Sequence, residues 1–165
     1  MKKSHRLRFL LVLVLAASAM AQTPSNSPKE DAVTNRVSGP FDVVVTRQED
    51  KSDDSNLARF TLDKRYHGEL QGTGKGQMLT AGTAVKGSGA YVAIEKFSGT
   101  LNGHAGSFVL QHSGTMTQNT PQLTITIVPD SGTDELKGIK GKMMITIAPD
   151  GKHSYDLEYT LPKND

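Results

Sequence analysis

Glu95 and His112 are the two side chains in this sequence best placed to do chemistry together. Each stands in a run where apolar and polar residues alternate, and each takes an apolar position of its run. If Asn102-Gly103 is a two-residue hairpin turn, Glu95 faces Leu110 and Ala93 faces His112, which makes the carboxylate and the imidazole diagonal neighbours. A carboxylate in an apolar interior is costly without a partner, so we expect the two side chains to meet directly or through water.

Three interpretations of this pair stay open. The pair binds the polar group of a small, largely apolar ligand, or it acts as base and acid in an isomerisation or cyclisation, or it only stabilises the core. In the third case the barrel is solidly packed and has a structural or interaction role through its exterior. The sequence favours the purely structural network over ligand binding, and ligand binding over catalysis, because buried polar networks often only specify packing. The candidate ligand-binding residues are Glu95, His112, Tyr91, Tyr155, Tyr159 and Phe97.

Other chemistry finds little support. The chain has no cysteine, and its remaining histidines lack the spacing of a metal site, so neither a metal nor another cofactor is expected. The glycines of 72–76 fit neither the dinucleotide-binding nor the phosphate-loop pattern, and no Gly-x-Ser-x-Gly hydrolase elbow occurs. These glycines instead indicate strand coiling or a bulge.

The elements that would position the pair are strands. Strand signals cover eight segments: 40–47, 57–67, 68–80, 88–100, 105–117, 121–129, 138–148 and 152–161. Turn residues at Asn102-Gly103, Asn119-Thr120 and 149–151 separate antiparallel neighbours, the last aligning Ile147 with His153. One face of each segment is apolar and no helix is expected to cover it, so the sequence predicts an all-β fold that closes into a single antiparallel eight-stranded β-barrel.

Seven runs of this sequence together form a recognisable pattern: YVAIE at 91–95, SGTL at 98–101, GSFVLQHSGT at 106–115, VPDSGT at 128–133, EL at 135–136, GIKG at 138–141 and YDLEY at 155–159. These runs resemble the bacterial domain-of-unknown-function family 3224. The resemblance spans about 38–161 and implies a barrel of the allene oxide cyclase type, similar in shape to dirigent proteins. It implies a fold without an activity.

The N-terminus has the features of a Sec-type signal peptide over 1–21, with a basic start, an apolar run and the cleavage pattern ending at Ala21. The sequence therefore predicts a periplasmic or secreted protein with a flexible lead-in over 22–36 and a barrel domain over 37–162. Without the four basic residues of the signal, fifteen of the nineteen Lys and Arg remain against seventeen Asp and Glu, a balance of −2. We expect no nucleic-acid partner and no stable membrane insertion. The sequence does not indicate a homo-oligomer. The expected partner is a small apolar ligand.

Overall fold

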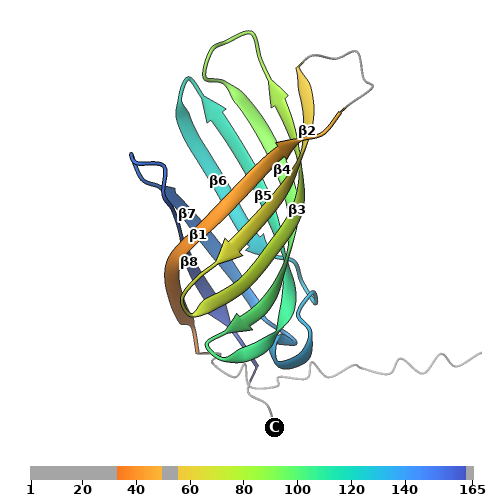
Figure 1. Cartoon of the computed structure of the whole chain (residues 1–165), viewed down its shortest axis with the longest axis vertical. Coiled ribbons are helices and arrows are strands. Elements are labelled where there is room, and N and C mark those ends of the chain that lie inside the picture. Colours follow the sequence, from red (N-terminus) through yellow and green to blue (C-terminus); the bar gives the residue numbers. More distant parts are fainter. Residues whose placement is uncertain (1–32, 50–55, 163–165) are drawn as a thin grey trace, which may run out of the picture. The chain divides into compact units, whose positions relative to one another are not determined.

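Eight antiparallel strands close into a barrel in the computed structural model, which describes residues 33–49 and 56–162. Each strand pairs with its neighbours in sequence, and the last strand pairs with the first (Figure 1). The strands are β1 (Asn35–Arg47), β2 (Leu57–Tyr66), β3 (Leu70–Gly82), β4 (Gly89–Leu101), β5 (His104–Thr117), β6 (Thr120–Ile127), β7 (Lys140–Ile147) and β8 (His153–Thr160). The predicted fold class is confirmed.

The predicted strands differ from these mainly at their ends. β1 begins at Asn35, inside the segment expected as lead-in, because residues 35–41 pair with β8 and Val37 is buried. The β5–β6 turn consists of Gln118 and Asn119, both with positive φ, one residue earlier than expected. The predicted signal peptide and most of the lead-in lie outside the described residues.

Helical structure in the described part of the chain is one 3-10 turn, η1 (Asp134–Leu136), in the β6–β7 connection. No helix there is long and apolar enough to cross a membrane. Leu136 is fully buried and packs with Ile139 into the core, so this connection covers one end of the barrel.

The strand register sets the size of the barrel. Directly paired residues can be followed once around the barrel from Val37 on β1. The path ends on β1 at Arg47, ten residues further along the strand. The paired residues in between are Leu157, Met143, Ile125, His112, Ala93, Met78 and Phe60. Such a stagger requires strands tilted by roughly 35–45° to the barrel axis. An eight-stranded interior is just wide enough to be filled by side chains or to hold one small ligand.

One end of the interior is filled, and we call it the packed half. It lies toward η1 and the β2–β3 and β4–β5 turns, and its buried side chains include Val37, Tyr66, Leu70, Phe97, Leu101, Phe108, Leu110, Leu157 and Tyr159. The rings of Phe97 and Phe108 lie 4.9 Å apart, and Tyr66 packs edge-on against Phe97 and Tyr155. Gly72 and Gly99 face each other across β3 and β4, where a Cβ on either would strike the opposite backbone, so the strands can approach closely here.

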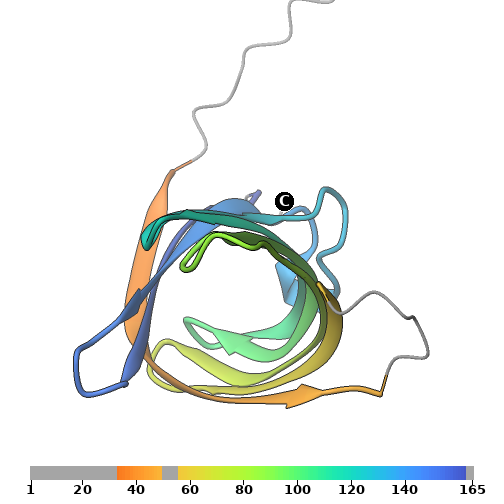
Figure 2. The same ribbon diagram turned by 90° about the horizontal axis from the view of Figure 1, so that it is seen from above.

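The opposite end is not filled, and we call it the open half (Figure 2 looks into it). Val45, Leu123 and Ile147 occupy inward-facing positions, since their cross-strand partners Leu62, Gly114 and His153 face inward, yet they are 48%, 41% and 64% exposed. The β7–β8 hairpin ends below the tips of the β3–β4 and β5–β6 hairpins (Figure 1), and β6 pairs with β7 only at two positions. The barrel is therefore shorter at the β7–β8 hairpin than at the other two hairpins, and apolar surface of its interior is exposed to solvent.

Candidate functional site

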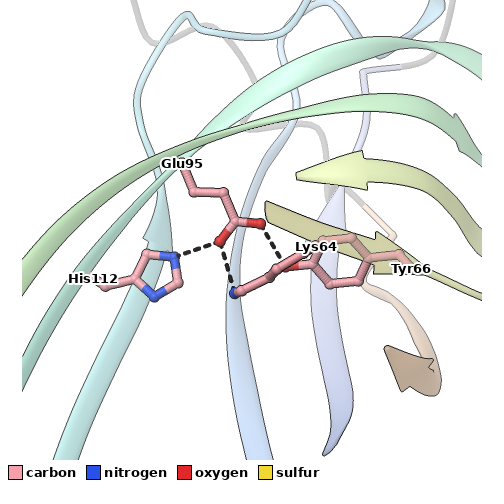
Figure 3. A network of polar contacts seen from close by, with 4 residues as sticks. All are labelled: Lys64, Tyr66, Glu95 and His112. Carbon is pink, nitrogen blue, oxygen red and sulfur yellow. Dashed lines mark hydrogen bonds and ion pairs between the residues drawn. The ribbon is translucent and has the colours of Figure 1, made fainter. Parts of the chain in front are cut away.

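Glu95 lies on β4 between the two halves of the barrel, and its side chain is completely buried. Nζ of Lys64 donates to Oε2 at 2.7 Å, and the hydroxyl of Tyr66 donates to Oε1 at 2.8 Å. Nε2 of His112 lies 3.2 Å from Oε2 (Figure 3). Lys64, Tyr66, Glu95 and His112 together form what we call the polar cluster.

Lys64 and Tyr66 are the two members of the polar cluster that the sequence analysis did not predict, and Lys64 is the less expected of them because it is charged. It lies on β2 between Leu62 and Tyr66, all three buried, within the charged run Asp63-Lys64-Arg65. The signal was present, because the alternation of Phe60, Leu62 and Tyr66 assigns Lys64 to the inner face. Its ammonium also lies 5.0 Å from the ring centre of Phe41, a favourable cation–π position.

His112 confirms the predicted register, since it pairs directly with Ala93 and lies diagonally from Glu95. The ring nitrogen Nε2 is close to the carboxylate, but its N–H does not have the alignment of a hydrogen bond. Figure 3 shows the other ring nitrogen pointing away from Glu95. The imidazole is therefore the least tightly held member of the polar cluster.

The charges in the cluster are balanced. Burial by itself would raise the pKa of Glu95, but His112, the Lys64 ammonium and the Tyr66 hydroxyl stabilise the carboxylate and lower its pKa to about 2. Burial, reinforced by the Glu95 charge, raises the pKa of the Tyr66 hydroxyl, which therefore stays protonated as a donor. The carboxylate and the ammonium form a neutral pair in the barrel interior.

Gly74 provides the space that the carboxylate occupies. It lies on β3 beside Glu95, and a Cβ there would overlap Oε1 of Glu95 and touch the ring of Tyr66. The glycines of 72–76, which fit no phosphate-binding pattern in sequence, thus lie within a strand, and Gly74 makes room for a buried ion pair.

The other predicted site residues do not join the polar cluster. Tyr91 lies in the open half, half-buried, with its ring against Gly114; burial, followed by the Glu95 charge, raises the pKa of its hydroxyl. Phe97, Tyr155 and Tyr159 belong to the packed half. The Tyr155 hydroxyl accepts from the Leu70 amide and donates to the His67 carbonyl, and the Tyr159 hydroxyl accepts from the Asn102 side chain. These two hydroxyls therefore stabilise the β2–β3 turn and the β4–β5 turn, respectively.

The comparison with known families decides the affiliation. The profile described as "Protein of unknown function (DUF3224)" matches residues 37–159. The chain belongs to the DUF3224 family. It is also similar to the crystal structure of a DUF3224 protein of unknown function from Shewanella oneidensis MR-1, with 44% identity and a TM-score of 0.75 over 79% of this chain and all of that one. No curated protein matches this chain.

The cluster of this DUF3224 barrel is poorly suited to acid–base catalysis. A general base works best with a pKa near the working pH, whereas that of Glu95 is about 2 and both carboxylate oxygens already accept from buried donors. Within 33–49 and 56–162, no group of three or more His, Asp or Glu residues is arranged to hold a metal ion. The arrangement can instead act as a polar floor beneath the open half.

Proposed function

We propose that this DUF3224 protein binds a small, neutral, largely apolar molecule in the open half of its barrel. The observation that carries the proposal is the solvent exposure of Val45, Leu123 and Ile147, three apolar residues at inward-facing positions. A solvent-exposed apolar surface inside a barrel favours a ligand that removes this surface from water. An interior that served only for stability would bury these side chains, as the packed half does.

The charge balance below the open half supports a neutral ligand. Lys64 and Glu95 neutralise each other at 2.7 Å, so no unpaired charge in the cluster attracts an ion. A charged ligand would lose its hydration on entering without gaining a partner. Glu95 is therefore part of the floor that supports the binding surface in this proposal, and not a ligand contact as the sequence suggested.

Tyr91 supplies a polar contact to the ligand in this proposal. It is at the level of Leu123 in the sheet, since both pair directly with Gly114. Its hydroxyl makes no hydrogen bond to any other described residue, whereas those of Tyr66, Tyr155 and Tyr159 all do. An accepting or donating group on an otherwise apolar molecule would satisfy it.

The experiment is a fluorescence titration with N-phenylnaphthylamine, a neutral apolar probe. We expect saturable binding, which Leu123→Lys weakens by at least about tenfold because it places a charge on the apolar surface. Thr124→Lys is the matched control, since Thr124 is the outward-facing neighbour, and it should bind like the unaltered protein. Absence of binding, or equal binding by both variants, would contradict the proposal.

Export is a second part of the proposal and rests on the sequence of 1–21 alone. Expression of the full chain in a Gram-negative host should yield a periplasmic product whose intact mass corresponds to a chain beginning at Gln22. A full-length product in the cytoplasm would contradict it.

A further inference from the structure

The outer surface of the barrel carries a hollow of about 960 Å³ across β2, β3, β4 and β5. Its apolar side chains are Leu79, Val92, Ile94 and Val109, all from outward-facing positions. Four inward-facing residues, Leu62, Gly76, Ala93 and His112, also border it, so its floor reaches down to the backbone of the sheet. We call this hollow the outer groove.

Three apolar side chains of the outer groove are more than half exposed to solvent. Leu79, Val92 and Ile94 are 57%, 53% and 54% exposed, and Leu79 and Val92 are directly paired across β3 and β4. Isolated apolar residues on a surface need no explanation, but a contiguous apolar hollow indicates a contact with another molecule.

Cations dominate the charged rim of the outer groove. Arg59, Lys75 and Lys96 line it, with Asp63 as the acidic residue. Lys75 pairs directly with Lys96 across β3 and β4, an unfavourable position for two like charges. Asp63 lies 2.8 Å from Lys75, whereas Lys96 forms no ion pair with another described residue. An anionic group beside Lys96 would relieve this repulsion.

The spacing of the cations and the apolar residues defines the shape of the occupant. Leu79 lies four residues beyond Lys75 on β3, and Val92 lies four residues before Lys96 on β4. At about 3.3 Å per residue, the two lysines are roughly 13 Å from Leu79 and Val92 along the strands, with Ile94 in between. The volume lies within the range of small-molecule sites, roughly 300–1,000 Å³.

We propose that the outer groove binds a single-chain anionic amphiphile, with its carboxylate beside Lys75 and Lys96 and its acyl chain along Ile94, Val92 and Leu79. Complementary charge argues for this occupant over a second copy of the chain, because a symmetric contact would bring the same cations together. The groove is distinct from the open half, which faces the barrel interior and favours a neutral molecule.

Isothermal titration calorimetry with decanoate, below the concentration at which it forms micelles, tests the proposal. Decanoate should bind at least about tenfold more tightly than decanol, and decyltrimethylammonium should not bind, if the cations recognise the head group. Lys96→Gln should weaken decanoate binding by about five- to tenfold, whereas Lys142→Gln, an outward-facing lysine on β7, should leave it unchanged.

A second pair of variants tests the acyl-chain contact. Ile94→Thr keeps a β-branched side chain in the strand and should weaken decanoate binding, whereas Val44→Thr, on the exposed outer face of β1, should not. Equal binding of decanoate, decanol and the cationic amphiphile would overturn the proposal. So would a dimer in sedimentation that Ile94→Lys dissociates, because the groove would then be an interface between copies.

Discussion

Nζ of Lys64 donates a hydrogen bond of 2.7 Å to Oε2 of Glu95 in the interior of the barrel, where the lysine side chain is 6% exposed and the carboxylate is fully buried. The two residues come from β2 and β4, which are not neighbours in the sheet, and the side chains meet over Gly74 of the intervening β3. The ion pair therefore links strands that no backbone hydrogen bond connects.

Glu95→Gln should destabilise the barrel by about 3–5 kcal/mol, since it leaves the Lys64 ammonium buried without a counter-charge. Urea unfolding measures the change. Glu158→Gln, which removes the partner of the exposed Lys142, should cost less than about 1 kcal/mol. Adding Lys64→Met to Glu95→Gln should recover much of the loss, and a double variant less stable than Glu95→Gln would argue against a charge effect.

The stability of the protein should fall in acid because of Glu95. Its pKa in the folded protein, about 2, lies below the ordinary value of 4.5, so the folded state favours the ionised form. The resulting stabilisation, about 3 kcal/mol, is present above the unfolded pKa and is lost as the pH falls from about 5 through about 2. Urea midpoints of the unaltered protein and of Glu95→Gln, measured across this pH range, isolate the contribution of the Glu95 carboxylate. If the two proteins lose stability in parallel as the pH falls, this contribution is refuted.

Gly74→Ala should destabilise the barrel by about 1–3 kcal/mol, because the added methyl overlaps the Glu95 carboxylate and the Tyr66 ring. Gly82→Ala in the same strand is the control. Its added methyl would meet the Asn56 carbonyl oxygen only at 3.7 Å, so thermal unfolding should be nearly unchanged. Equal effects of the two substitutions would show that the space beside Glu95 is not what Gly74 provides.

Tyr155→Phe should loosen the β2–β3 turn. The Tyr155 hydroxyl joins the Leu70 amide and the His67 carbonyl to β8, and its loss leaves the buried Leu70 amide without this acceptor, at a cost of about 1–3 kcal/mol. Hydrogen exchange of the Leu70 amide should accelerate in the variant. Tyr159→Phe removes a hydroxyl that accepts from the Asn102 side chain and not from the Leu70 amide, so it should leave that amide protected.

Most of the fold was predictable because strand alternation and turn chemistry agree along this chain. Asn102 and Gly103 have the positive φ that a two-residue hairpin turn needs, and this turn alone fixes the pairing of Ala93 with His112. The start of β1 was missed because Gly39 and Pro40 interrupt its apolar pattern. The start of β1 is stabilised by its pairing with β8. This pairing joins the two ends of the barrel domain, so the local sequence does not predict it.

The site was predictable only in part. The contact of Glu95 with His112 follows from local hairpin register and is confirmed. Lys64 and Tyr66 reach Glu95 across an intervening strand, so finding them requires the barrel stagger as well as the alternation of β2. Tyr155 and Tyr159 were candidate ligand-binding residues together with the pair, but the same stagger places them in the packed half. The outer groove was missed because Leu79 lies on a different strand from Val92 and Ile94, and the three side chains form one surface only after β3 and β4 pair.

Methyl NMR of the protein with bound N-phenylnaphthylamine locates the ligand directly. The methyl resonances of Val45, Leu123 and Ile147 should shift on saturation, while those of Val92 and Ile94 in the outer groove should stay in place. Unmoved Leu123 and Ile147 methyls, or shifts confined to Val92 and Ile94, would contradict a binding site in the open half of the barrel.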